Sequence, residues 1–260
     1  MKAPAFAYVK PASLPEAFEL LQNPHAKILA GGQSLIPSLN MRLSSPELLV
    51  DITGLPGLSE IVNSGRMVKI GALVTHARME QSAEIGKHVP LLAQAVPHIA
   101  HAAIRNRGTI GGSLALADPA AEYPAVAVAL DAVFHVEGKK GKRSVKATEF
   151  FKGLFETDLK HGELLTAVEF PVAAKSDRSV FLELTRRHGD YAIIGLAACN
   201  SKFVFLGAGA KPVLIEGKSI QETKENLKNL KPAADLYNSS ATKLYLAGVL
   251  LERAWNTLST

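Results

Sequence analysis

Two glycine-rich segments contain residue types that could bind a small anionic molecule. They are AGGQSLIP at residues 30–37 and TIGGS at residues 109–113. A diphosphate must come within hydrogen-bonding distance of backbone N–H groups, and glycine permits this approach because it has no Cβ and adopts positive φ readily. Both segments also carry hydroxyl or amide side chains that could bond a phosphate: Gln33, Ser34, Thr109 and Ser113. The sequence therefore predicts a bound phosphate compound.

Known phosphate-binding fingerprints match neither segment. Neither contains the G-K-[ST] of a Walker loop, and neither has the G-x-G-x-x-G of ordinary nicotinamide-binding proteins. A strand, such a turn and the start of a helix would still bring free N–H groups and the positive helix end to one point. A Gly-Gly pair at a strand end is by itself more often a tight turn than a ligand site. The two segments together favour a ligand without identifying it.

The other reactive residues form no recognised site. The eight histidines show no H-E-x-x-H spacing and no cysteine partner, so no metal site is predicted. Neither Ser34 nor Ser113 lies in G-x-S-x-G, which leaves a serine hydrolase without its nucleophile motif. No nucleic-acid-binding motif is present. Residues 186–191, RRHGDY, are either a solvated turn or a positive patch with an aromatic side chain placed over a ring.

Length and composition predict a globular protein with a sizeable core. The 260 residues are 47% hydrophobic and 20% charged, which excludes disordered, collagen-like and coiled-coil classes. Cys199 is the only cysteine, so the chain alone can hold neither a disulfide framework nor an iron–sulfur cluster, which takes four thiolates. The net charge of +5 is a mild excess. Without an export signal or an apolar run of roughly 18 residues, we expect a cytoplasmic protein with no membrane span.

The elements that position the two segments follow from local signals. Ser13 and Glu16 have the spacing of a capping box and predict a helix over about 14–22. An apolar run at 27–30 predicts a strand that ends at the first glycines, and a helix is expected over 34–43. Further strands are predicted at 48–52, 67–70, 132–136 and 164–170, with helical patterns between 75 and 101 and a basic hairpin tip at 139–143.

The rest of the chain completes an α+β architecture. Residues 105–113 carry three glycines within five residues and are predicted to be neither helix nor strand. From about 175, strands are expected at 181–184, 192–198 and 203–206, followed by helices at 219–230 and 240–256. The expected organisation is three lobes in sequence, at residues 1–54, 55–174 and 175–260.

Four segments resemble the FAD-binding medium subunit of molybdenum hydroxylases, a family that includes the carbon monoxide dehydrogenase medium chain and the flavin domain of xanthine dehydrogenase. The similar segments are AGGQSLIP, RNRGTIGGSLALADPAAEYP, FFKGLFETDLKHGELLTAVEFP and FLELTRRHGDYAIIG. They follow one another in the family's order from about residue 4 to 215. The resemblance implies a fold of the vanillyl-alcohol-oxidase or p-cresol-methylhydroxylase type, in which two α+β lobes grip FAD and a C-terminal lobe lies beside them.

The resemblance also implies a set of cofactor-binding residues. Both glycine segments would surround the FAD diphosphate through Ala30, Gly31, Gly32, Gln33, Ser34, Leu35, Thr109, Ile110, Gly111, Gly112 and Ser113. Glu122 replaces an acidic residue, usually Asp, that binds the sugar portion of FAD. Leu165 falls where the family packs an apolar residue against the cofactor, and Tyr191 falls where an aromatic lies near the isoalloxazine. Bulky residues at Gly32 and Gly111 should abolish FAD retention, and no catalytic acid, catalytic base or metal ligand is expected.

By the same resemblance, this chain would be one part of an electron-transfer complex. A large subunit with a molybdopterin cofactor would oxidise the substrate, and a small subunit with two [2Fe–2S] clusters would relay electrons to non-covalently bound FAD here. The FAD would pass them to an external acceptor, and the complex is expected to be a dimer of heterotrimers. The single cysteine agrees, because the clusters must then lie on another polypeptide.

One departure from the family and two alternatives stay open. Residues 199–206 lead almost directly to the segment 207–212, where related chains generally have a longer hairpin, so partner docking or flavin access should change more than FAD binding. The first alternative is a self-contained FAD oxidase of a small alcohol. The second is a phosphate-ligand binding protein without redox chemistry. The residues identify neither the substrate nor the electron acceptor.

Overall fold

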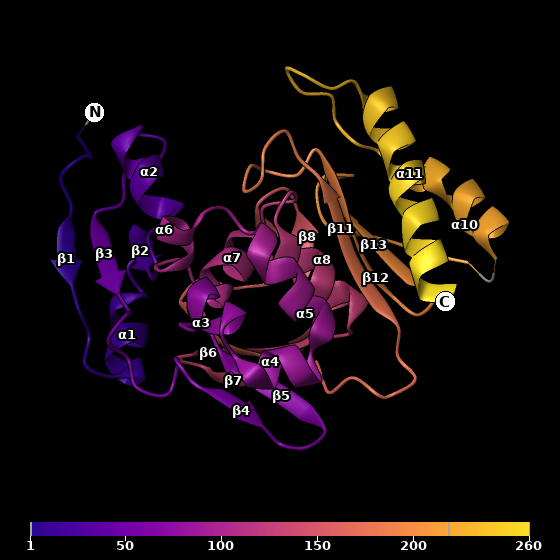
Figure 1. Ribbon diagram of the computed structural model, residues 1–260. Helices are drawn as coiled ribbons and strands as arrows, with labels where there is room; N and C mark the ends of the chain where they lie inside the picture. The colour runs from indigo at the N-terminus through magenta and orange to yellow at the C-terminus, as the bar shows by residue number, and fades with distance from the viewer. Residues whose placement is uncertain (1, 218, 260) are drawn as a thin grey trace.

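The computed structural model describes residues 2–217 and 219–259. Three sheets follow one another along the chain, each covered by helices, so the predicted α+β class is confirmed. Figure 1 shows the first sheet at one side of the molecule, the second with its helices in the middle, and the third with the two last helices at the other side. No helix within the described residues is long and apolar enough to cross a bilayer.

The first sheet is parallel and small. Its strands are arranged in the order β1 (Ala7–Val9), β3 (Leu48–Asp51) and β2 (Ala26–Leu29). The connecting helices are α1 (Leu14–Leu20) and α2 (Leu35–Asn40). At the start of α1, Ser13 Oγ accepts from the Glu16 N–H and the Glu16 carboxylate accepts from the Ala12 N–H, which confirms the predicted cap.

The second sheet is antiparallel and has five strands. Their order is β4 (Ile61–Asn63), β5 (Met67–Gly71), β10 (Glu163–Pro171), β6 (Val133–Gly138) and β7 (Gly141–Lys146). Its helices are α3 (His76–Glu80), α4 (Ala83–His88), α5 (Pro90–Ala95), the 3₁₀ turn η1 (Val96–His98), α6 (Ala102–Arg105), α7 (Ile110–Leu116), α8 (Glu122–Ala129) and α9 (Ala147–Phe150). A small ribbon of β8 (Phe151–Gly153) and β9 (Glu156–Thr157) lies beside it.

The prediction that residues 105–113 contain no helix is wrong. Arg105 is the last residue of α6. Helix α7 begins at Ile110, although it contains two adjacent glycines that each destabilise a helix by about 1 kcal/mol. Thr109 caps α7 by accepting from the Gly112 N–H over 3.1 Å. Ile110 and Leu114 are fully buried in a hydrophobic core to which the second and third sheets both contribute. Tertiary packing therefore outweighs the low helix propensity of this segment.

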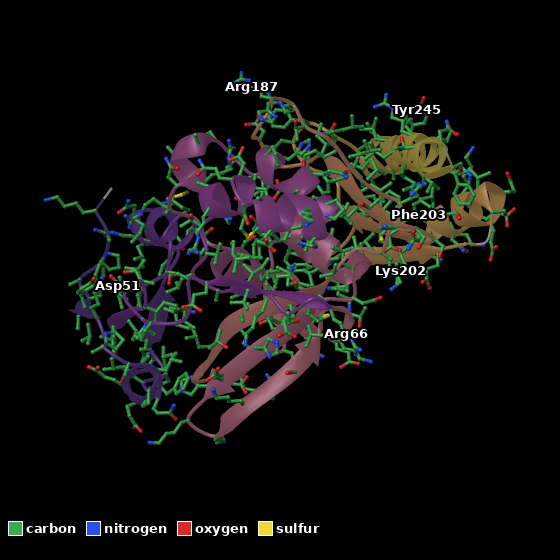
Figure 2. All side chains as sticks on the ribbon, turned by 60° about the horizontal axis from the view of Figure 1, so that its bottom comes forward. Asp51, Arg66, Arg187, Lys202, Phe203 and Tyr245 are labelled. Carbon is green, nitrogen blue, oxygen red and sulfur yellow. The ribbon has the colours of Figure 1, made fainter. Side chains whose placement is uncertain are left out.

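The third sheet is an antiparallel meander packed on both faces. It contains β11 (Ser179–Leu184), β12 (Ile194–Cys199), β13 (Lys202–Leu206) and β14 (Val213–Glu216), followed by α10 (Ile220–Asn226), η2 (Leu227–Asn229) and α11 (Ser240–Ser259). On one face Phe203 stacks on Trp255 of α11, with ring centroids 5.8 Å apart (Figure 2). The opposite face packs on α5 and α8 and shares their hydrophobic core through Phe181 and Val204.

Candidate functional site

The first glycine segment touches the backbone directly before the second. Gly31 follows β2, and a Cβ built on it would lie 2.1 Å from the carbonyl oxygen of Arg107 and 2.9 Å from Cα of Gly108. Figure 1 shows α6 beside α2 and β2, so the chain after α6 reaches the end of β2. Only glycine leaves room for this contact. The fold thus joins two segments that are far apart in sequence, as expected for parts of one site.

The first segment offers free backbone donors. Gly32 has φ +74°, a left-handed conformation that favours glycine. Within residues 2–217 and 219–259, no protein acceptor takes the N–H groups of Gly32, Gln33, Ser34 or Leu35. The Ser34 hydroxyl does not cap α2, and its side chain is exposed. Consecutive open N–H groups at a turn before a helix form a concave site for an anion.

In the second segment, the backbone N–H groups of residues 110–113 already donate to acceptors within the protein. The N–H of Ile110 donates to Val74 over 3.0 Å, and the N–H of Gly111 donates to Ala72 over 2.9 Å. The next two N–H groups of α7 donate to Thr109. The expectation of free N–H groups at both turns is therefore wrong for this one. A Cβ on Gly111 would lie 2.4 Å from the Ala72 methyl carbon, so this glycine serves packing.

A buried histidine packs against Gly108, the residue directly before the second segment. His76, the first residue of α3, is buried, and its Nδ1 lies 3.0 Å from the hydroxyl of fully buried Tyr123. A Cβ on Gly108 would lie 2.5 Å from His76 Nε2, so the glycine backbone rests on the imidazole. Burial, and secondly the charge of Arg105, lowers the pKa of His76 to about 4. The ring is therefore uncharged at neutral pH.

We expect acid to destabilise the protein through His76. Its pKa is about 4 in the folded chain and near 6.5 when unfolded, so the unfolded state binds the extra proton first. Stability from this group is complete above pH 6.5 and is lost as the pH falls toward 4, by about 3 kcal/mol at most. Urea unfolding at pH 7 and pH 5 measures the loss. His76→Asn should flatten this difference, and an equally steep difference in that variant would contradict the assignment.

Glu122 and Leu165 lie in the interior. Glu122 is the first residue of α8 and is 8% exposed, and burial raises the pKa of its carboxyl to about 8. Asp118, Glu183 and His98 are close enough to act on its charge. Leu165 of β10 is buried in the same hydrophobic core as α7. Both predicted residues therefore lie in the part of the fold that carries the second glycine segment.

Tyr191 lies at the end of the loop between β11 and β12. The residue is 73% exposed, yet the pKa of its phenol is raised, first by burial at the hydroxyl end and then by the charges of Asp118 and Glu122. In the same loop the Arg186 guanidinium lies 3.9 Å from the ring centroid of Tyr237, while Arg187 points away from the molecule (Figure 2). The loop thus brings Tyr191 close to Asp118, which follows α7, and to Glu122, which begins α8.

The sequence patterns missed the residues that hold this site together. Arg105 bonds the carbonyls of Ile99 and Ala100 and pairs with Glu80 at 2.9 Å. His76 supports Gly108, as described above. No local signal distinguishes either side chain, because their partners come from other elements. Arg105 does begin the RNRG stretch of a family-like segment, and in the sequence this position alone connects it with the site.

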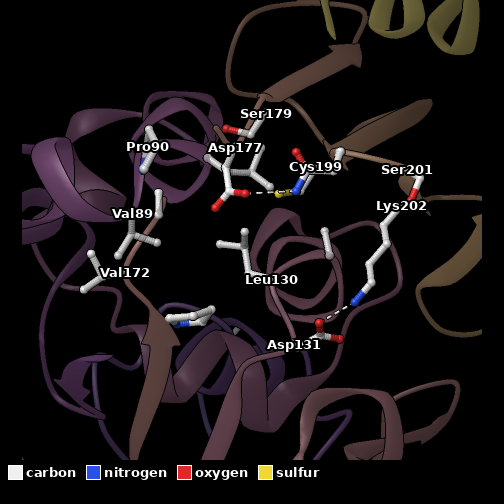
Figure 3. A pocket seen from close by; sticks show the side chains of 15 residues that line it. Val89, Pro90, Leu130, Asp131, Val172, Asp177, Ser179, Cys199, Ser201 and Lys202 are labelled. Carbon is white, nitrogen blue, oxygen red and sulfur yellow. Dashed lines mark hydrogen bonds and ion pairs between the residues drawn. The ribbon is translucent and has the colours of Figure 1, made fainter. Parts of the chain in front are cut away.

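A cavity of about 270 Å³ lies away from all the predicted cofactor residues (Figure 3). It opens between the ends of α5 and α8 and the β12–β13 turn. Four of its polar side chains form pairs within the lining, since Asp177 accepts from Asn200 over 3.1 Å and Lys202 pairs with Asp131. Burial raises the pKa of the Cys199 thiol, which lines the same cavity. Among the described residues, no group of three or more His, Cys, Asp and Glu is placed to hold a metal ion.

Comparison with known proteins identifies the family. Residues 4–173 match the FAD binding domain in molybdopterin dehydrogenase. The chain is 46% identical over 200 residues to the 6-hydroxypseudooxynicotine dehydrogenase complex subunit alpha of Paenarthrobacter nicotinovorans, covering 76% of this chain and 68% of that one. It is 37% identical to the glyceraldehyde dehydrogenase medium chain of Sulfolobus acidocaldarius, covering 94% and 88%.

A solved structure agrees over the whole length. Carbon monoxide dehydrogenase of Hydrogenophaga pseudoflava, in a form that lacks the Mo-pyranopterin moiety, superposes with a TM-score of 0.96 at 32% identity over 100% of this chain and 99% of that chain. The expected α+β fold is thereby confirmed as the fold of this carbon monoxide dehydrogenase chain. The paired glycine segments, the match over residues 4–173 and these relatives all agree: the chain belongs to the FAD-binding medium subunits of molybdenum hydroxylases, which are oxidoreductases.

Proposed function

We propose that this chain holds one FAD non-covalently, with the diphosphate against the first glycine segment. The observation that supports this most directly is the row of unpaired N–H groups at residues 32–35, placed by the contact of Gly31 with Arg107. An anion there would be bonded by the backbone and would face the positive end of α2. The second segment would contribute the hydroxyl of half-buried Ser113 and the exposed surface of Gly112, while buried Thr109 caps α7 and holds the segment in place.

We place the remaining cofactor contacts along α7 and beyond its C-terminal end. We assign Glu122 to the sugar portion, Leu165 to an apolar wall and Tyr191 to the neighbourhood of the flavin ring. Residues 1–54 and 55–174 would form the two lobes that grip FAD, and residues 175–260 the C-terminal lobe that carries Tyr191. When bound, FAD supplies the redox chemistry, and these side chains bind and orient it.

The proposed role is electron transfer within a complex. Electrons would enter from [2Fe–2S] clusters on a small subunit, after a large molybdopterin subunit oxidises the substrate, and leave to an external acceptor. The names of the relatives, a complex subunit and a medium chain, support partners of this kind. We propose a dimer of heterotrimers in the cytoplasm, where the free thiol of Cys199 would stay reduced.

Purification of the tagged chain from its native host tests this function. We expect released FAD, a molybdopterin and two further polypeptides in fixed ratio by mass spectrometry. FAD without partner chains, together with oxidation of small alcohols by the lone chain, would contradict the subunit role. A preparation without flavin, although the chain is folded by circular dichroism, would contradict the assignment of the glycine segments.

A further inference from the structure

His98 and Glu183, from distant parts of the sequence, form a pair under the β11–β12 loop, and Glu122 lies close enough to interact with both charges. His98 ends η1, Glu122 begins α8 and Glu183 lies in β11; we call them the carboxyl–histidine cluster. His98 Nδ1 lies 3.1 Å from one oxygen of Glu183, whose side chain is 3% exposed. The other Glu183 oxygen is buried without a hydrogen-bond partner. A buried carboxylate oxygen left without a donor is costly, so this one calls for a proton or a hydrogen-bond donor.

The charges around the cluster are mainly acidic. Two of its three members are carboxyl groups, and Asp118 faces Glu122 from the turn between α7 and α8. From the β11–β12 loop come Tyr191 and His188, whose ring centroid lies 6.1 Å from that of His98. In the described part of the chain, no lysine or arginine forms an ion pair with Glu122 or Glu183. Within residues 2–217 and 219–259, His98 is the ion-pair partner of Glu183 and neutralises it when the imidazole is protonated.

This arrangement favours retention of a proton near neutral pH. Buried carboxylates close to one another cannot all ionise without a large electrostatic cost. Burial raises the pKa of Glu122 to about 8, and the hydrogen bond with Glu183 raises the pKa of His98. Groups that titrate near the working pH gain or lose a proton in response to a small change in local potential.

The cluster lies at the far end of the helix that begins at the second glycine segment. The seven residues of α7 rise about 10 Å from Thr109 toward Asp118. FAD extended along α7 from the proposed diphosphate position would therefore bring its sugar and ring portion toward Glu122 and Tyr191. This placement rests on the proposed function.

We propose that His98, Glu122 and Glu183 form a proton-exchange site that takes up a proton when the flavin beside Tyr191 is reduced. Two electrons and one proton convert FAD to FADH⁻ and add one negative charge to the ring. The electrons come from a reductant, the [2Fe–2S] clusters in the complex, and the proton comes from water. The added charge raises the pKa of neighbouring acids, so the cluster takes a second proton from water and balances it. His188, exposed beside His98, lies on the solvent side.

The test is the number of protons taken up per flavin reduced, measured on the intact complex. The midpoint potential of FAD is titrated spectroscopically between pH 6 and pH 9. Each proton per two electrons contributes about 30 mV per pH unit. Around pH 8 we expect the midpoint potential of FAD in the wild-type complex to change with pH more steeply than the one-proton value of about 30 mV per pH unit. The second proton should add at most about another 30 mV per pH unit. In Glu183→Gln the slope should return to the one-proton value, with FAD content unchanged.

A matched control is available in the second sheet. There His135 Nε2 lies 3.3 Å from Glu169, a second His–Glu pair outside the cluster, so Glu169→Gln should leave the slope unchanged. A wild-type slope in Glu183→Gln that retains FAD overturns the proposal and leaves FAD binding intact. Should that variant fail to fold, His98→Asn decides by the same readout. Absence of FAD from the wild-type complex would instead overturn the proposed function.

Discussion

Replacing Gly31 with alanine is expected to give a chain that retains little or no FAD. The new Cβ would lie 2.1 Å from the Arg107 carbonyl oxygen, whereas carbon–oxygen contacts lie at about 3.3–3.6 Å. The oxygen belongs to the backbone and the position of a Cβ is fixed by the backbone, so no side-chain rotation relieves the contact. The two glycine segments would have to separate by about 1 Å, which removes the arrangement of N–H groups at residues 32–35.

The flavin content of the purified variant, measured by absorbance after release, checks this result. Gly86→Ala in α4 is the matched control, because a Cβ there meets nothing within 4 Å. That control should retain FAD and gain about 0.4–1 kcal/mol of stability from the change of glycine to alanine in a helix. Full flavin content in Gly31→Ala would show that the contact between the segments does not form the site.

The local signals of the sequence predict the elements but not the way that the site is closed. The capping box at Ser13 predicts α1, and apolar runs predict β2, β3 and β10 within a few residues. Strands β1 and β4 have three residues each, too few for a periodic pattern. The one wrong assignment, at residues 105–113, fails because packing of α7 against the core decides its structure and local propensity does not.

The division of roles between the glycine segments could not be predicted from either segment. Whether an N–H stays open depends on which acceptors other elements bring to it. Ala72 and Val74, between β5 and α3, supply carbonyls to the second segment, and no acceptor from the described part of the chain reaches the N–H groups of residues 32–35. Glycine in both segments is therefore required for different reasons. Gly111 makes room for Ala72, while Gly32 adopts positive φ next to the open donors.

The same limit applies to the predicted side chains. Glu122 and Tyr191 lie in separate family-like segments, and the fold brings both close to the end of α7. His98 belongs to no motif, and Glu183 lies in the FLELTRRHGDYAIIG segment without any local signal that sets it apart. Their role becomes visible only when β11 packs on α5 and one carboxylate oxygen of Glu183 is buried without a hydrogen-bond partner. Long-range packing creates this chemistry, so a pattern along the chain cannot reveal it.

Replacing Arg105 with alanine is expected to lower the free energy of unfolding by about 3–5 kcal/mol and to weaken FAD binding further. The guanidinium is 14% exposed, donates to the Ile99 and Ala100 carbonyls over 3.1 and 3.0 Å, and pairs with Glu80. Ala100 has φ +45°, a strained conformation for alanine that these bonds fix in place. Its carbonyl also packs on Gly189 of the loop that carries Tyr191.

Loss of this one side chain should therefore loosen both sides of the proposed cofactor site. On one side the chain from Ala100 runs into Arg107 and its contact with Gly31, and on the other it supports Gly189. Urea unfolding of the flavin-free protein measures the stability term, since bound FAD would add to it by mass action. Lys139→Ala is the control, because its ion pair with Glu19 at 2.8 Å is exposed and contributes less than about 1 kcal/mol. If Arg105→Ala unfolds with the same midpoint as this control, the hydrogen bonds of Arg105 do not hold the loop, and the separation of the glycine segments must be limited by Gly31 packing alone.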